Sequence, residues 1–376
     1  MAGFLDASSG EPLLPQARES WVAARQAGWG DPLRLHRPGR LASQALDRAR
    51  EVVAVTVGAR PDEVVFTGSG ATAAQAAVQG LALGRRRVGR VIVSSAVDHS
   101  AVLGAAAAYG DPVRVPVDGT GRIDLVAWAQ AVRGPGVACA SLQVANHEVG
   151  TVQPYVEAAT ACAEAGVPLV LDATSALGRV DLTGAGPWSV LIGSALAYGG
   201  PAGVGLLVLR RTARWRPPYP ADDYQGGRWP GVPDVPAIVA AAVALEVWAG
   251  DGEDVGRRQH TLVDRLRSGV AAQVSGVDVA GDPVGRVPHL LTFSVLYVDG
   301  ETLTLELDRA GFAVASGSAC SATSEVPSHV LAAMGALTHG NVRIGLTRAT
   351  TAADIKRFLR ALPPVVAGLR ARLGAP

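Results

Sequence analysis

Lysine is almost absent from this chain of 376 residues, since Lys356 is the only one and arginine supplies the other fixed positive charges. A coding bias that favours arginine and alanine explains the scarcity in general. Arginine cannot replace lysine where a neutral amine must form a covalent bond, because the guanidinium group stays protonated. Chemistry that needs a lysine amine therefore has one candidate in the whole sequence.

An excess of charge of either sign is also missing. The chain has 34 basic and 33 acidic residues, which gives a net charge of +1, and charged residues make up only 18% of it. This balance gives no electrostatic reason to expect nucleic acid or an anionic membrane as a partner. Apolar residues make up 48%, which argues against disorder and predicts a largely buried α/β interior.

The chain has few cysteines and no long apolar run. Its three cysteines, Cys139, Cys162 and Cys320, are odd in number and lack the spacing of metal ligands. The longest apolar stretch, residues 236–245, is too short to span a bilayer and ends at Glu246. The first residues show no basic segment followed by an apolar one, as a secretion signal would. We therefore expect a cytoplasmic protein without a membrane anchor.

Short β-branched runs alternate with alanine-rich helical stretches between residues 63 and 211. This alternation predicts a mostly parallel sheet with helices on both faces. The predicted strands are 64–67, 88–94, 113–117, 138–144, 169–172, 190–194 and 205–209. The predicted helices between them are 72–83, 101–109, 125–132 and 156–165.

The remainder predicts a long loop, a long helix and a smaller α+β unit. The loop covers residues 217–236, and the helix runs from 236 to 250 and again from 255 to 274. The smaller unit has predicted strands at 290–295, 312–315 and 342–346 and predicted helices at 301–309, 327–334 and 352–373. We expect a large domain at 14–255, and a small domain made of 1–13 together with 256–376.

Polar residues follow several of the predicted strands, where ligands bind in sheets of this kind. The run Ser-Gly-Ala-Thr at 69–72 ends a strand and opens a helix, so its free N–H groups and the Thr72 hydroxyl suit a phosphate. His99 can stack on a ring, and Asn146 can hydrogen-bond a phenolic oxygen. Asp172 ends an apolar strand, where a carboxylate needs a partner such as a protonated pyridine nitrogen. Together these groups suit pyridoxal phosphate, although each alone has a structural explanation.

The order of these motifs resembles the cysteine desulfurases, which have the class V aminotransferase fold of type I pyridoxal-phosphate-dependent transferases. The similar segments are Ser-Gly-Ala-Thr at 69–72, Asp-His at 98–99, Ala-Asn-His-Glu-Val-Gly at 145–150, Asp-Ala-Thr at 172–174, Gly-Gly-Pro-Ala-Gly-Val-Gly at 199–205, Ala-Ser-Gly-Ser-Ala-Cys-Ser at 315–321, Pro-Ser-His-Val-Leu at 327–331 and Asn-Val-Arg-Ile-Gly-Leu at 341–346. Near the start, Gly-Asp-Pro at 30–32 resembles the family's Gly-Asn-Pro. The resemblance implies a large domain with a seven-stranded sheet and a smaller α+β domain at the C-terminal end.

The resemblance also implies a role for each site residue. Arg343 would bind the substrate carboxylate through two parallel hydrogen bonds, aided by Asn146 and the position of Asp31. Cys320 would attack the substrate sulfur and carry it as a persulfide. The residues implied in cofactor binding are Ala71, Thr72, His99, Asn146, Asp172, Ser175 and Ser194, with His99 stacked on the ring and also catalytic.

The pattern breaks at the residue that the chemistry needs most. The family places its Schiff-base lysine in a Ser-Gly-His-Lys segment, but here the segment is Ser-Ala-Leu-Ala, with Ala197 at the lysine position. Leu196 replaces a phosphate-binding histidine, and Ser175 replaces a glutamine at the ring oxygen. Lys356, on the predicted last helix, resembles an ordinary surface lysine. Loss of a general acid–base group alone typically costs about 10²–10⁴-fold in rate.

Two further departures from the family pattern lie outside the lysine segment. Val232 stands where a loop threonine would reach the phosphate of the partner subunit, in a shortened loop at 226–233. Asp31 stands where an asparagine would help to hold the substrate carboxylate, and a second carboxylate there is repulsive. Several coordinated losses indicate natural divergence.

The sequence leaves three functions open, and with them the question of whether the chain is an enzyme. The first is a sulfur-transfer protein that accepts persulfide on Cys320 and passes it to an acceptor protein. The second is a pseudo-enzyme subunit that pairs with an active desulfurase and regulates or scaffolds it. The third uses pyridoxal phosphate bound without a covalent link. The cofactor is thus non-covalent or absent, and the chain is expected to dimerise with itself or with an active relative.

Overall fold

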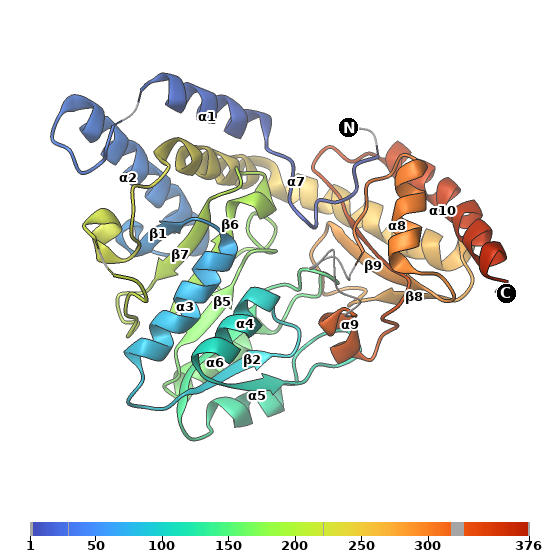
Figure 1. Ribbon diagram of the computed structural model, residues 1–376, viewed down its shortest axis with the longest axis horizontal. Coiled ribbons are helices and arrows are strands. Elements are labelled where there is room, and N and C mark those ends of the chain that lie inside the picture. The colour runs from blue at the N-terminus through green and yellow to red at the C-terminus, as the bar shows by residue number, and fades with distance from the viewer. Residues whose placement is uncertain (1–2, 29, 221, 317–326, 375–376) are drawn as a thin grey trace.

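A sheet of seven strands forms the centre of the larger part of the molecule (Figure 1). The computed structural model describes residues 3–28, 30–220, 222–316 and 327–374. The strand order is β1-β7-β6-β5-β4-β2-β3. The strands are β1 (Val64–Thr67), β2 (Val91–Ser95), β3 (Asp111–Val115), β4 (Val137–Gln143), β5 (Leu169–Asp172), β6 (Val190–Ser194) and β7 (Gly205–Leu209).

The neighbours from β6 to β3 are parallel, whereas β7 runs antiparallel to both β6 and β1. The prediction of a mostly parallel seven-stranded sheet is therefore confirmed. Strands β4 and β7 are buried along their whole length, as expected for strands with a helix layer on each face.

Helices cover both faces of this sheet, as the sequence predicted. On one face, α3 (Gly70–Gly84) and α4 (Ser100–Tyr109) pack against Val65, Ile92 and Cys139. The other face is covered by α2 (Arg37–Val57), α5 (Leu125–Val132), α6 (Tyr155–Glu164) and the first half of α7, with α1 (Pro15–Gln26) packed outside them. The carboxyl ends of β2, β4, β5 and β6 consequently meet at one edge, which is where the candidate site lies.

Helix α7 (Val235–Gln273) runs unbroken for 39 residues, so the predicted break between 250 and 255 is wrong. Gly252 is buried in the helix, where an added Cβ would lie 3.1 Å from the ring of Trp248. A glycine at this point permits close packing and does not end the helix. Among the described helices, α7 alone is long and apolar enough to cross a membrane, but its buried residues pack into both hydrophobic cores.

The smaller domain is a three-stranded antiparallel sheet in the order β10-β9-β8 with helices against it. Its elements are β8 (Val277–Ala280), β9 (Leu290–Val295), α8 (Gly300–Arg309), α9 (His329–Met334), β10 (Asn341–Gly345) and α10 (Ala352–Leu373). The strand predicted at 312–315 is wrong, because Ala313 and Ala315 form only isolated bridges, to Phe4 and Arg343. β8 was not predicted.

The N-terminal segment belongs to the core of the smaller domain. Leu5 is fully buried there, and Asp6 bridges to Gly345. Along α7, Trp248 packs in the large-domain core and Leu262 in the small-domain core. The division at 14–255 against 1–13 with 256–376 stays a prediction, because the continuous helix α7 crosses residue 255.

Candidate functional site

A cavity of about 230 Å³ opens at the carboxyl edge of the parallel strands. Side chains from four separate loops meet there because parallel strands all end on the same edge of the sheet. The residues that line it are Ser69, Gly70, Ala71, Ala74, His99, Ala101, Gln143, Ala145, His147, Asp172, Thr174, Ser175 and Ser194. The structure thus brings together five of the residues singled out from the sequence, Ala71, His99, Asp172, Ser175 and Ser194.

One end of the cavity is the N-terminus of α3 beside the end of β6. Ser69 caps the helix by accepting a hydrogen bond from the Thr72 N–H at 3.1 Å. A Cβ on Gly70 would lie 2.8 Å from the Cβ of Ser194, so only glycine lets the helix start approach this strand so closely. The helix dipole and the Ser194 hydroxyl together make an end that suits a phosphate group.

Thr72 itself does not line the cavity. Its hydroxyl lies 2.9 Å from the carbonyl oxygen of Ser69 and 3.1 Å from the Ser69 hydroxyl. The hydroxyl is thus engaged inside the capping turn. The proposed role of Thr72 in phosphate binding stays a prediction.

Asp172 supplies the negative charge at the other end of the cavity. One of its oxygens accepts a hydrogen bond from the Thr174 N–H at 2.9 Å, and the structure gives the other oxygen no donor among the described residues. Asp98 is fully buried, and burial raises its pKa to about 7, with the charge of Asp172 adding to the rise. A positively charged ring nitrogen is the partner that such a carboxylate would stabilise.

Two histidines line the cavity with their rings edge to face. Their ring centroids are 4.8 Å apart and the planes are inclined by 66°. The Nδ1 atom of His99 accepts a hydrogen bond from the Ala101 N–H at 3.1 Å, which leaves Nε2 as its donor nitrogen. Neither ring nitrogen of His147 has a hydrogen-bond partner among the described residues, and both are shielded from solvent.

His147 is held as a neutral base. Burial lowers its pKa well below the usual value, and the nearby charges of His99, Arg343 and His329 lower it further. Its Nε2 atom lies 3.7 Å from the Glu148 carboxylate, which instead accepts a hydrogen bond from the Ser328 hydroxyl at 2.6 Å. The sequence analysis did not single out His147. Its position next to Asn146 was the available signal.

Asn146 is fully buried and does not line the cavity. Its side-chain oxygen accepts hydrogen bonds from the N–H groups of Glu148 and Val149, both at 2.8 Å, and its amide donates to the carbonyl of Val97 at 3.1 Å. These bonds shape the loop that carries His147. The proposed contacts of Asn146 with cofactor and substrate stay predictions.

Arg343 lies on β10 of the smaller domain, close enough to His147 to lower its pKa. Its Nε–H donates to the Ser8 hydroxyl at 2.9 Å, and its backbone pairs with Ala315 through two hydrogen bonds of 2.7 and 3.1 Å. Arg343 is therefore placed beside the start of the segment that contains Cys320. Cys320 itself lies outside the described residues.

Asp31 does not line the cavity. It accepts hydrogen bonds from the Leu33 N–H at 3.0 Å, the Arg34 Nε–H at 3.1 Å and the Tyr224 hydroxyl at 3.1 Å. These partners hold its pKa below the usual value, the Leu33 N–H being the largest contribution. The structure of this single chain brings Asp31 to the loop of Tyr224, and its proposed role in substrate binding stays a prediction.

Ala197 lies in the short helix η2 (Ala195–Tyr198) after β6 and is tied to a buried ion pair. Its carbonyl oxygen accepts a hydrogen bond from Arg179 at 2.9 Å, and Arg179 also bonds Glu11 at 3.2 Å. Burial lowers the pKa of Arg179 to about 10, so it remains protonated at neutral pH. Lys356 is exposed on α10, and no lysine lines the cavity within the described ranges.

The two described cysteines are buried. Cys139 lies on β4 and Cys162 on α6, and both are free thiols without solvent exposure. Burial raises the pKa of each thiol to about 12, so neither is a nucleophile at neutral pH.

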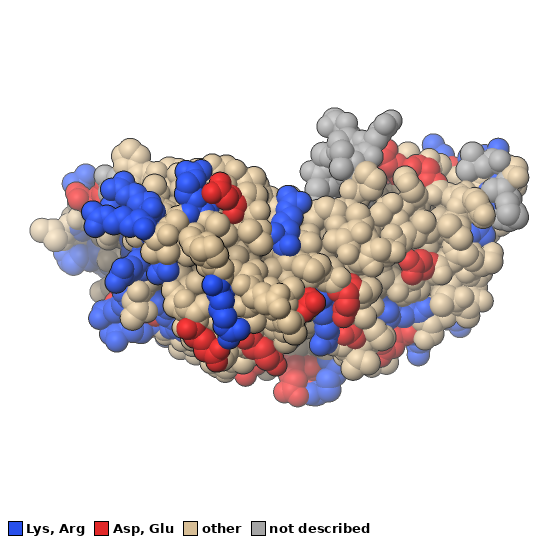
Figure 2. Space-filling model, turned by 90° about the horizontal axis from the view of Figure 1, so that it is seen from below, with Lys and Arg blue, Asp and Glu red and all other residues tan. Residues whose placement is uncertain are grey.

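Acidic and basic side chains are interspersed on the face seen in Figure 2, with blue side chains gathered at the large-domain end on the left. This mixed surface agrees with the net charge of +1.

Comparison with known proteins gives consistent matches along the chain. The family model for aminotransferase class V matches residues 28–358. A cysteine desulfurase of Cereibacter sphaeroides is 37% identical over 98% of this chain and 96% of its own length. An IscS-like cysteine desulfurase of Mycobacterium tuberculosis is 35% identical over 98% of this chain and 97% of its own.

Solved structures agree in fold. A NifS-like protein superposes with a TM-score of 0.90 at 24% identity, covering 98% of this chain and 100% of that protein. DndA from Streptomyces lividans superposes with a TM-score of 0.77 at 28% identity, covering 91% of this chain and 99% of that protein.

The buried histidines give a prediction for stability against pH. Burial holds the pKa of both His147 and His289 well below 6.5 in the folded state, whereas an unfolded chain titrates near 6.5. As pH falls below about 6.5, the unfolded chain takes up protons that the folded chain does not, so stability is lost by up to about 1.4 kcal/mol per pH unit for each residue. Above pH 6.5 neither residue contributes a slope.

Urea unfolding between pH 5 and 8 measures this slope. His147→Gln should flatten the acid limb, whereas His339→Gln, at an exposed position, should leave it unchanged. An acid limb in His147→Gln as steep as in the wild type would show that His147 is charged in the folded state.

Proposed function

The chain belongs to the class V aminotransferase family, with cysteine desulfurases as relatives over nearly its whole length, and from this premise we propose that it transfers sulfur without generating it. In this proposal the chain does not catalyse desulfuration of cysteine alone, and it accepts persulfide sulfur on Cys320. The observation that carries it is a cofactor-type cavity whose lining contains no lysine in the described part of the chain.

The cavity residues fit pyridoxal phosphate. The N-terminus of α3 and Ser194 would hold the phosphate group, Asp172 would pair with the ring nitrogen and His99 would lie against the ring. When bound, the group would act as an electron sink for amino-acid chemistry. Ala71 and Ser175 contribute to the same lining, and the group would be held by non-covalent contacts only.

Ala197 offers no amine, and the residues around it hold its backbone carbonyl in place. The carbonyl of Ala197 is fixed by Arg179, which is itself fixed by Glu11 and stacks over the ring of Trp248 at 4.7 Å from its centroid. An arginine next to the missing amine cannot take its place, because it stays protonated. The exposed Lys356 on α10 does not line the cavity.

The relay on Cys320 needs no oxidant. The Cys320 thiolate would attack the outer sulfur of a donor persulfide, which forms a new S–S bond at Cys320 and breaks the old one. The electron pair of the broken bond leaves with the donor, which departs as a thiolate. The same exchange in reverse passes the sulfur to an acceptor protein.

A second function is favoured by His147. Its unpaired ring nitrogens and lowered pKa give the cavity a neutral base, which could hold the proton that a lysine would otherwise move. On this hypothesis the chain is an enzyme with non-covalent cofactor. In the alternative function the chain is a pseudo-enzyme subunit that scaffolds an active desulfurase. The experiments below distinguish this function from the other two.

A groove between α1, α2 and the start of α7 suits a partner subunit. It has a volume of about 900 Å³ and is lined by Leu41 and Val232, which are 55% and 50% exposed. Large exposed apolar side chains around one groove are typical of subunit interfaces. We expect dimerisation through this face, with itself or with an active relative, in the cytoplasm and without membrane or nucleic acid.

The first prediction from the proposed function concerns a covalent link between the protein and pyridoxal phosphate. After incubation with pyridoxal phosphate and reduction with borohydride, the wild type should carry no stable pyridoxyl adduct, because residue 197 has no amine. Ala197→Lys should gain a stoichiometric adduct located by mass spectrometry. An absorbance band in the wild type that dialysis removes would favour the non-covalent enzyme.

Ala202→Lys is the matched control, since it adds a lysine at an exposed position five residues further on. It should remain unmodified under the same conditions. A wild-type adduct on Lys356, or equal labelling of both lysine variants, would contradict the proposal.

The second prediction concerns the relay. When the protein is mixed with an active desulfurase and cysteine, mass spectrometry should find persulfide on Cys320 and none in Cys320→Ser. Cys139 and Cys162 serve as internal controls, because their buried thiols should stay unmodified. Stoichiometric binding to the desulfurase without sulfur on Cys320 would replace the relay with the scaffold function.

The third prediction concerns assembly. Light scattering at micromolar concentration should give a dimer, and Leu41→Asp should give a monomer because a buried unpaired charge is costly at an interface. Val126→Asp, at a 68% exposed position on α5, should stay dimeric. A monomeric wild type that pairs with an active desulfurase would identify a heterodimer, and a dimeric Leu41→Asp would place the interface elsewhere.

A further inference from the structure

A second cavity, of about 410 Å³, lies at the opposite end of β1 from the candidate site. Asp62, just before β1, lines this cavity, whereas Ser69, just after it, lines the other, and the two share no lining residue. The walls come from α2, the short helix η1 (Pro61–Glu63) and the short helix η3 (Tyr224–Gly227). It shares Pro233 with the groove proposed as a subunit interface, and the proposed sulfur transfer does not use it.

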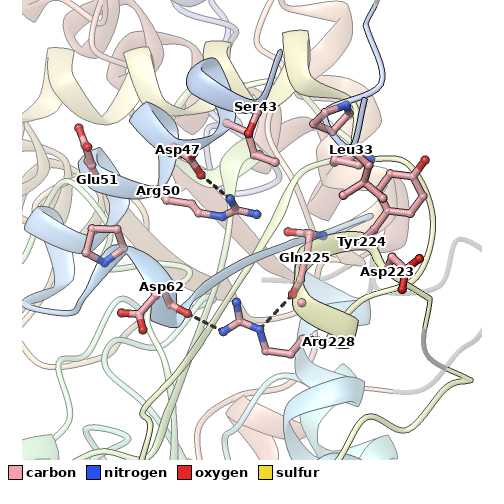
Figure 3. Close-up of a pocket in the computed structure, with 15 residues that line it drawn as sticks. Leu33, Ser43, Asp47, Arg50, Glu51, Asp62, Asp223, Tyr224, Gln225 and Arg228 are labelled. Atoms are coloured by element: carbon pink, nitrogen blue, oxygen red, sulfur yellow. Dashed lines mark hydrogen bonds and ion pairs between the residues drawn. The ribbon is translucent and has the colours of Figure 1, made fainter. Parts of the chain in front are cut away.

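Two guanidinium groups point into this cavity (Figure 3). Arg50 reaches in from α2, and Arg228 reaches in from the loop after η3. Burial lowers the pKa of Arg228, and the positive charge of Arg50 lowers it further, so the two charges repel each other across the cavity. An anion between them would remove this repulsion.

Each guanidinium keeps unused donors. Arg50 donates to the carboxylate of Asp47 at 2.7 Å, while its Nε–H is shielded from solvent and has no partner among the described residues. Among the residues that the structure describes, Arg228 donates to backbone carbonyls alone, to that of Gln225 at 3.1 Å and that of Asp62 at 2.7 Å. Neither of these carbonyls neutralises its charge.

The loop that carries Arg228 is fixed firmly to the sheet. Gln225 has a left-handed backbone, with φ of 49°, and its buried side chain bonds both the N–H and the carbonyl of Phe66 at 2.7 Å. The amide of Gln225 thus continues the hydrogen bonding along the free edge of β1. A residue held in this uncommon conformation by two buried bonds gives Arg228 a fixed position before any ligand arrives.

Most carboxylates in the wall are already paired. Asp62 bonds Arg60 and Arg211, and Glu51 bonds Arg48. Asp47 is shared with Arg50, and Asp223 is exposed at the rim. Within the described residues, no carboxylate is bonded to Arg228, and Arg50 has Asp47 alone. The hydroxyl of Ser43 and the apolar side chain of Leu33 lie in the same wall.

From this arrangement we infer that the cavity binds the phosphate group of a small phosphorylated metabolite between Arg50 and Arg228. Guanidinium groups suit phosphate because their parallel N–H donors match its oxygens. The Ser43 hydroxyl would add a further donor, and the ring of Tyr224 with Leu33 would cover the rest of the molecule. This site is separate from the pyridoxal-phosphate-type cavity and does not depend on the proposed sulfur transfer.

Titration with inorganic phosphate tests the inference. Calorimetry at constant ionic strength should detect binding to the wild type, and Arg50→Gln and Arg228→Gln should each weaken it at least tenfold. Arg40→Gln is the matched control, because it removes the same charge from the same helix at an exposed position that does not line the cavity, and it should stay within about twofold of the wild type.

Phosphate can also bind at the α3 N-terminus, and Ser194→Ala separates the two sites. The Arg50–Arg228 binding should persist in Ser194→Ala. Absence of binding in the wild type, equal weakening by Arg40→Gln, or loss in Ser194→Ala with retention in Arg50→Gln would each overturn the inference. Unfolding temperatures measured without phosphate show whether each variant is folded. If Arg228→Gln does not fold, Arg50→Gln still tests the inference.

Discussion

The convergence of parallel strand ends at one edge of the sheet is the constraint on which the rest of this structure depends. Strands β2, β4, β5 and β6 are buried on both faces, so their side chains are apolar and the polar groups are confined to the loops after them. The cavity, its phosphate-type end and the carboxylate of Asp172 all follow from this geometry. The loss of one amine leaves them in place, because none of them depends on residue 197.

A buried network explains why the region of Ala197 stays ordered without its amine. Glu11 from the N-terminal segment, Arg179 from the large domain and Arg348 from the small domain meet around Trp248. Breaking a buried ion pair typically costs about 3–5 kcal/mol, so the three segments are strongly coupled. The same network holds the carbonyl of Ala197 in position.

In this chain arginine fills the structural and binding roles of a positively charged side chain, and lysine is almost absent. It holds a buried charge at Arg179, lies beside the candidate site at Arg343 and lines the second cavity at Arg50 and Arg228. Each of these tasks uses the planar fork of donors, and none needs a neutral amine. The scarcity of lysine is therefore compatible with binding functions and removes one kind of covalent catalysis.

The sequence alone determined the architecture and several of the residues that line the site. Strand-helix alternation predicted a mostly parallel sheet, and the resemblance to the cysteine desulfurases implied its seven strands. The resemblance also implied the cofactor-binding residues that the structure brings to one cavity, which are Ala71, His99, Asp172, Ser175 and Ser194. The absence of lysine at 197 could also be read from the sequence, since identity at a position needs no coordinates.

Tertiary structure alone decided what depends on packing between distant segments. The unbroken α7 follows from Gly252 packing against Trp248, which no local propensity indicates. The neutral state of His147 and the engagement of Asn146 depend on burial and on bonds between loops. The Arg50–Arg228 cavity joins residues 178 positions apart in a chain of 376, and their meeting is fixed only when Gln225 bonds to the edge of β1.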